Sequence, residues 1–180
     1  MGKYIATEYV KPSEIKNIRK KLGVTQKEFA EMIGSSKPSV ERWEVSDGVI
    51  SGPLALLIKV LNEHSEIIDE LSIPEKKYPL RMWYMYKDKP CTLIDVDDTN
   101  EKVSIKNYVS NYIFRAFGTN ANPTYADYIY FLKSRCFPET RDKLKLELSR
   151  IGVPFYDPYL IVEKTQGRMA EDDFWIRIED

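Results

Sequence analysis

The sequence predicts an α+β protein with two parts, an all-helical N-terminal bundle of four to five helices and a small C-terminal α+β domain. Up to Leu71, apolar residues recur at helical spacing between short glycine-containing turns. After the stretch SIPEKKYPL at 72–80, which holds two prolines, the pattern changes to the alternation typical of strands. We therefore expect a helical domain over 1–71, a linker over 72–80 and an α+β domain over 81–180.

The expected helices of the first part share a start signal, a residue that suits the first turn of a helix. These signals are Ser13, Thr25 with Glu28 in a capping box, Ser36, and Ser51-Gly52-Pro53. A weaker helical stretch continues to Leu71. Before the helices, KYIATEYV at 3–10 is rich in β-branched and aromatic residues, which favours a short strand or arm.

Strand and helix patterns are mixed in the second part. Three strands are expected first, over 80–86, 91–96 and 102–109, with DDTNEK as the turn between the second and the third. Helical patterns follow over 124–136, 138–152 and 157–167. The segment FWIRIE predicts a final strand, with Phe174, Ile176 and Ile178 on one side.

The charge of the chain is balanced overall and uneven locally. The net charge is −1, with 43% hydrophobic and 31% charged residues, as in an ordinary globular protein. Residues 11–42 hold eight Lys or Arg against four Glu, whereas 43–70 hold six acidic residues against one Lys. Such a dipolar region suits contact with phosphate on one side, although a solvated helix surface explains the charges equally well.

No residue set typical of catalysis or metal binding is apparent. Cys91 and Cys136 are far apart, and His64 is the single histidine, so neither a metal-ligand spacing nor a nucleophile with its base is present. No apolar run reaches membrane-spanning length, and no signal peptide opens the sequence. We expect a cytoplasmic protein that is not an enzyme and has no cofactor.

The segment GVTQKEFAEMIGSSKPSVERWE carries the most specific pattern. It reads as two short helices joined by a Gly-Ser-Ser turn, which sets the helices at a steep angle. Val40 and Trp43 share one face of the second helix and would anchor it, leaving three polar side chains outside. These are Lys37, Ser39 and Arg42. A helix held in this way can enter the major groove of DNA.

From Ser13 to about Leu61 the chain resembles the Xre/Cro-type helix-turn-helix family, and within it the MqsA-type antitoxins. The shared features are TQKE, a glycine-containing turn, the triplet Arg-Trp-Glu and LLIKVLNEHSEII, in that order. The resemblance implies phosphate contacts at the start of one helix and major-groove contacts from the next. The implied residues are Thr25, Gln26 and Lys27 for phosphate, and Ser36, Lys37, Ser39 and Arg42 for the groove.

Two features depart from the MqsA-type pattern. Pro38 stands where those proteins place a base-reading Asn, so the operator sequence does not carry over. Their zinc-binding domain is missing, because two isolated cysteines cannot supply it. For Arg42 two interpretations stay open, a bidentate contact with guanine or an ion pair with Glu41 or Glu44.

The C-terminal part contains two further patterns. Asp95, Asp97 and Thr99 match the DxDxT motif of haloacid dehalogenase phosphatases, but such enzymes need a parallel sheet, which the adjacent short strands do not favour. We interpret the motif as a polar turn. A second pattern resembles a small module of bacterial loci that encode HipA-like kinases, which implies protein contacts. Its residues are Arg135, Pro138, Arg141, Leu144, Gly167, Asp172, Trp175 and Ile176.

These observations predict a sequence-specific regulator of transcription that binds double-stranded DNA as a homodimer. The resemblance adds the expectation of an antitoxin-type autorepressor with a cognate toxin-like partner. Aromatic residues around NYVSNYIFRAFG suit a dimer or partner surface, and stacking on single-stranded nucleic acid is a weaker alternative. The competing class is a toxin-neutralising interaction module with little DNA readout, which Pro38 favours. A phosphatase is a remote alternative.

Overall fold

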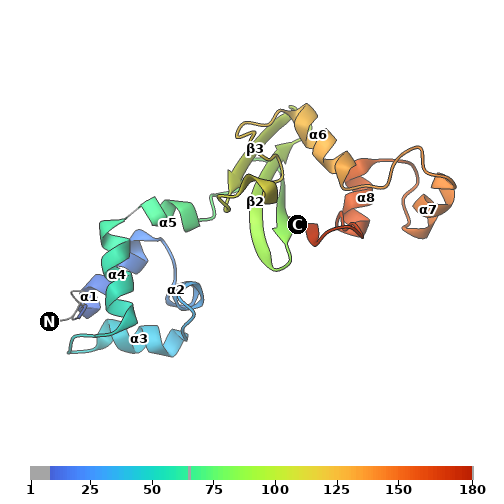
Figure 1. Ribbon diagram of the computed structural model, residues 1–180. Helices are drawn as coiled ribbons and strands as arrows, with labels where there is room; N and C mark the ends of the chain where they lie inside the picture. The colour runs from blue at the N-terminus through green and yellow to red at the C-terminus, as the bar shows by residue number, and fades with distance from the viewer. Residues whose placement is uncertain (1–8, 65, 180) are drawn as a thin grey trace. The chain divides into compact units, whose positions relative to one another are not determined.

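The chain forms two compact units, residues 1–73 and 74–180 (Figure 1). The computed structural model describes residues 9–64 and 66–179. Of the predicted strand or arm over 3–10, residues 3–8 lie outside this part. Val10 lies inside it and forms an antiparallel bridge with Ile50.

The first unit is helical, as predicted. Its helices are α1 (Pro12–Lys21), α2 (Gln26–Met32), α3 (Lys37–Val45), α4 (Pro53–Glu63) and α5 (Glu66–Leu71). The predicted cap at Ser13 is wrong, because the cap of α1 is Lys11 and Pro12 takes the first helical position. Proline is favoured there since it lacks the N–H that the first turn leaves unpaired. The Lys11 backbone N–H donates to Glu14 Oε2 at 2.8 Å.

The predicted caps of α2 and α3 are confirmed. Thr25 Oγ1 accepts from the Glu28 backbone N–H at 3.2 Å, and Glu28 Oε2 accepts from the Thr25 backbone N–H at 2.7 Å. Ser36 Oγ accepts from the Ser39 backbone N–H at 3.3 Å. Gly34, at a φ of +64°, follows the last residues of α2 and begins the connection to α3 in the left-handed conformation that glycine adopts most easily.

The core of the first unit draws on every helix. Its buried residues are Val10, Ile15, Ile18, Phe29, Ala30, Val40, Ala55, Ile58, Leu61 and Ile68. Trp43 packs against this cluster while partly exposed. The core therefore fixes α3 through its inward face and leaves its outward face to solvent.

The second unit contains an antiparallel sheet with the strand order β3-β2-β1-β4. Its strands are β1 (Leu80–Tyr86), β2 (Lys89–Asp97), β3 (Lys102–Asn107) and β4 (Phe174–Glu179). The first three follow one another as hairpins, and β4 returns from the end of the chain to pair with β1. The α+β class is confirmed.

Helices α6 (Tyr125–Ser134) and α8 (Pro158–Thr165) pack with one face of the sheet in the main core of the second unit. Helix α7 (Leu144–Arg150) is shorter than predicted. The segment 138–143 is not helical because Lys143, just before α7, has left-handed φ and ψ of 60° and 31°. A left-handed residue cannot continue a right-handed helix.

The opposite face of the sheet carries a smaller cluster of Trp83, Met85 and Leu93, with Tyr108 and Trp175 packed against it. Cations lie over its rings: the Arg177 guanidinium is 5.6 Å from the centre of a Trp83 ring, and that of Arg168 is 4.6 Å from a Trp175 ring. These contacts give the face a mixed aromatic and basic character.

Candidate nucleic-acid interface

Helix α3 is held in the first unit by two side chains of its inward face. Val40 is fully buried, and Trp43 packs against the same cluster. Lys37 and Arg42 are exposed on the outward face, and Ser39 is half-buried. The structure therefore agrees with the expectation that an anchored helix turns these side chains outward. The agreement is complete for the exposed Lys37 and Arg42 and partial for the half-buried Ser39.

The outward side chains of α3 differ in the contacts they already make. Lys37 Nζ lies 2.9 Å from Glu41 Oε1, and the hydroxyls of Ser36 and Ser39 lie 2.9 Å apart. The Arg42 guanidinium has no hydrogen-bond or ion-pair partner within residues 9–64 and 66–179. Arg42 is therefore the side chain of this face with the most freedom to contact a base.

The alternative ion pair of Arg42 is not formed, because both candidate acids have other partners. Glu41 pairs with Lys37 as above, and Glu44 pairs with Arg19, with 2.6 Å between Glu44 Oε1 and Arg19 Nε. Arg19 Nη2 also donates to Glu44 Oε2 at 3.0 Å, so the contact is bidentate.

Residues 1–72 match the profile of the family described as the antitoxin component of bacterial toxin-antitoxin systems, MqsA. A curated relative, Antitoxin MqsA of Escherichia coli (strain K12), is 33% identical over 67 residues. The N-terminal unit is an MqsA-type domain. The aligned part is 37% of this chain and 51% of the relative, so the chain spans about half the length of the relative it matches. No solved structure matches the chain significantly.

Within the MqsA-type domain, the contact of Glu44 connects three helices. Besides Arg19 of α1, it accepts a hydrogen bond from Gln26 Nε2 of α2 at 2.9 Å. Arg19 Nη1 donates to the Val24 carbonyl at 3.1 Å, which ties the turn before α2 to the same group. The hydrogen bonds from Arg19 hold the pKa of the Glu44 carboxyl below its usual value. Sequence spacing did not reveal this contact, because its members lie 18 and 25 residues apart.

The three predicted phosphate contacts lie together at the start of α2 in the MqsA-type domain. Thr25 and Lys27 are exposed, and Lys27 Nζ is 3.8 Å from Glu31 Oε1 in a solvent-exposed pair. The Gln26 side chain is engaged with Glu44, so only its backbone N–H is left for the predicted role. The phosphate contacts themselves stay a prediction.

Pro38 does not distort helix α3 of the MqsA-type domain. It occupies the first turn of α3, where a proline costs no intrahelical hydrogen bond. Its ring is exposed beside Lys37 and offers no hydrogen-bond donor or acceptor to a base. Base readout at this position is therefore limited to apolar contact.

The DxDxT motif of the second unit is structural. Both oxygens of Asp95, which is buried, accept from Arg81, at 2.7 Å from Nε and 2.8 Å from Nη2. Asp95 Oδ2 also accepts the Lys77 backbone N–H at 2.7 Å. Asp97 accepts from Asn100 within the turn between β2 and β3. The sheet is antiparallel, contrary to what the phosphatase alternative requires.

Four residues of the pattern that resembles the HipA-locus module meet in space. The Arg135 guanidinium donates to the Asp172 carboxylate at 2.7 and 2.9 Å, and to the carbonyls of Gly167 and Phe174 at 2.9 Å. Ile176 of β4 packs next to Gly167. These residues attach β4 to α6, which explains their spacing without a partner protein.

The remaining side chains that could bind a metal ion or act as nucleophiles do not form a site in the described part of the chain. Within the described residues, no three His, Cys, Asp or Glu side chains are arranged to hold a metal ion. Cys91 and Cys136 are separate, buried, free thiols of the second unit. In the described part of the chain, no helix combines the length and the apolar character needed to span a bilayer.

Proposed function

We propose that this protein is a sequence-specific, antitoxin-type regulator that binds double-stranded DNA in the cytoplasm and represses its own operon. The observation that carries the proposal is the outward face of α3, where Arg42 is exposed and, among the described residues, unpaired on a helix that Val40 and Trp43 anchor. Arginine without an intramolecular partner is suited to a bidentate contact with guanine in the major groove.

The proposed roles follow from position. Thr25, Gln26 and Lys27 contact phosphate at the start of α2, which sets the register of α3 on the duplex. Ser36, Lys37 and Ser39 contact the groove near Arg42. The contact between the two serines and the pair of Lys37 with Glu41 exchange for contacts with DNA. A single module of this size covers little DNA, so we propose a homodimer that binds two half-sites.

An antitoxin-type regulator also requires a toxin-like partner, and the second unit offers an apolar surface for it. Tyr112 at 55%, Ile113 at 67% and Tyr130 at 77% are among the strongly exposed large apolar side chains of this unit. Aromatic side chains are enriched in the cores of protein interfaces. This surface supports a second candidate function, that of an interaction module in which DNA readout is weak.

Binding to the DNA directly upstream of the gene, against a scrambled duplex and across a salt series, tests the proposal. A repressor prefers the upstream duplex at moderate salt, and the logarithm of its affinity falls steeply with the logarithm of the salt concentration. Equal and weak binding to both duplexes contradicts DNA readout and favours the interaction module instead.

Arg42→Ala tests the assignment of the base contact. We expect the variant to lose about 1–3 kcal/mol of preference for the upstream duplex, because that is the discrimination of one bidentate contact. Arg150→Ala removes the same charge from α7 of the second unit and is the matched control. An unchanged preference in Arg42→Ala, with an intact fold by circular dichroism, rules out Arg42 as the reader.

A further inference from the structure

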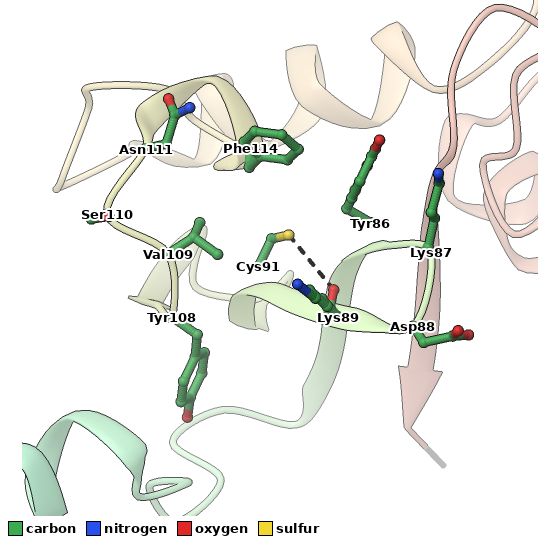
Figure 2. A pocket seen from close by; sticks show the side chains of 10 residues that line it. All are labelled: Tyr86, Lys87, Asp88, Lys89, Cys91, Tyr108, Val109, Ser110, Asn111 and Phe114. Carbon is green, nitrogen blue, oxygen red and sulfur yellow. Dashed lines mark hydrogen bonds between the residues drawn. The ribbon is translucent and has the colours of Figure 1, made fainter.

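A cavity of about 660 Å³ opens in the second unit, between the hairpin of β1 and β2 and the segment that follows β3 (Figure 2). Its apolar lining comes from both sides, with Tyr86 and Cys91 on the hairpin and Val109 and Phe114 on the facing segment. A volume of this size is typical of sites for small molecules. None of the proposed DNA contacts lines it.

The cavity exists because β3 separates from β2 before it reaches the first residues of β2. Beyond the last ladder pair, Thr92 with Asn107, the Tyr108 backbone N–H donates to the Cys91 carbonyl at 2.9 Å. The chain then turns into the short 3-10 helix η1 (Tyr112–Phe114), which places the Phe114 ring over the start of β2 (Figure 2). The space between the diverging segments is the cavity.

Both walls are held by contacts of their own. Arg115 donates to the carbonyls of Val109 and Ser110 at 2.8 and 3.0 Å, which fixes the segment after β3. On the other side, Trp175 Nε1 donates to the Lys87 carbonyl at 2.7 Å, which fixes the hairpin. A site with fixed walls binds a ligand without first paying the entropy of ordering them.

The interior of the cavity is aromatic and uncharged. The rings of Tyr86 and Phe114 meet edge to face, with their centres 4.9 Å apart. Burial raises the pKa of the Cys91 thiol, and the thiol donates a weak hydrogen bond to the Lys89 carbonyl at 3.6 Å. The sulfur therefore acts as a small apolar group at neutral pH.

One uncompensated positive charge lies at the rim. The Lys87 ammonium is paired with Asp173 at 3.3 Å. The Asp88 carboxylate points away from the space between Cys91 and Phe114 (Figure 2). The exposed Lys89 ammonium has no hydrogen-bond or ion-pair partner among the residues that the structure describes.

We propose that this cavity binds a small planar apolar molecule that carries one anionic group. The rings of the ligand lie against Tyr86 and Phe114, and its anion pairs with Lys89. Aromatic contact supplies the favourable burial, and the single cation selects for an anion and sets its orientation. The proposal does not depend on DNA binding, so either can fail alone.

Fluorescence titration of the full chain with 8-anilinonaphthalene-1-sulfonate tests the proposal, with the neutral N-phenyl-1-naphthylamine as the uncharged counterpart. We expect one molecule of each dye per chain. Lys89→Glu weakens binding of the sulfonate about tenfold, as expected for reversing a charge in contact with the anion, and leaves the neutral dye unaffected. Lys145→Glu, on α7, is the matched control and changes neither.

A second variant tests the apolar interior. Val109→Trp fills the cavity and abolishes binding of both dyes, with the urea midpoint of unfolding as the check on folding. Sulfonate binding that survives Lys89→Glu undiminished overturns the proposal, as does a loss in Lys145→Glu of equal size. The same holds for absent or non-stoichiometric binding to the unmodified chain. Because Lys89 is exposed, we expect Lys89→Glu to fold, so the test with this variant remains valid even where Val109→Trp does not fold.

Discussion

Glu44 is the residue on which the arrangement of α1, α2 and α3 depends most. Its side chain is 3% exposed and accepts hydrogen bonds from Arg19 and Gln26. Glu44→Gln removes the charge and leaves the half-buried guanidinium of Arg19 without its anion. We expect the free energy of unfolding to fall by about 2–3 kcal/mol, measured by urea titration. Glu63→Gln, in an exposed pair with Lys59, is the control and changes little.

The same residue gives the stability of the protein a defined dependence on pH. Because Arg19 lowers the pKa of Glu44 in the folded state, the unfolded state binds more protons as the solution becomes acidic. The stabilisation is complete above the unfolded pKa of about 4.3 and is lost as the pH falls through the lower folded value. The Glu44→Gln variant therefore loses less stability than the parent chain between neutral pH and pH values near 3. Parallel losses in both proteins contradict this assignment.

Gly167 is the second residue whose role can be measured directly. It has a φ of +59°, and a Cβ at this position would lie 3.1 Å from Arg135 Cβ and 3.3 Å from Ile176 Cδ1. Gly118 has a similar φ of +55° with open space around it, so Gly118→Ala measures the backbone cost alone. We expect Gly167→Ala to destabilise the fold by about 1–3 kcal/mol more than Gly118→Ala, by urea titration. Equal losses in the two variants mean that Arg135 moves aside freely.

At the scale of elements, the start of α7 carries a strained residue. Lys143 has left-handed φ and ψ, a conformation that raises the energy of a non-glycine residue because its Cβ crowds the backbone. Lys143→Gly should therefore raise the free energy of unfolding by about 0.5–1 kcal/mol. Lys145→Gly, two residues later and inside the helix, should lower it by about 1 kcal/mol. A loss of stability in both variants means that the left-handed turn does not form in solution.

The elements that the sequence predicted well are those with local signals. The capping box of Thr25 and Glu28 spans three residues, β1 is rich in aromatic residues, and β4 carries an apolar residue at every second position. The sequence does not predict where α7 starts, because the left-handed residue before it is Lys143 and not a glycine. Arg135 and Asp172 lie 37 residues apart, and only the resemblance to the HipA-locus module places both in one pattern. The periodicity of apolar residues does not reveal contacts between residues so far apart in the sequence. The cavity beside Cys91 also depends on such contacts, so the sequence does not predict it.

At the scale of the whole molecule, the two larger hydrophobic cores of the described residues belong to separate units. The cluster around Ile15, Phe29 and Val40 draws only on residues of the first unit, and the cluster around Met82, Tyr128 and Ile161 only on the second. Domains with separate cores can unfold separately. A function divided between a DNA-binding unit and a partner-binding or ligand-binding unit is consistent with this division.

The two cores predict that destabilisation of one unit leaves the other unchanged. Trp43 lies in the first unit, and Trp83 and Trp175 lie in the second, so tryptophan fluorescence of a Trp43→Phe chain reports the second unit alone. In that background we expect Gly167→Ala to lower the urea midpoint of the fluorescence transition. Glu44→Gln should leave it in place while shifting part of the far-ultraviolet circular dichroism transition. Distant sites without shared partners behave additively, so the double variant should show both effects at full size. A fluorescence midpoint that moves with Glu44→Gln would mean that the two units unfold as one, and the stability of the first unit would then respond to anything that binds the second.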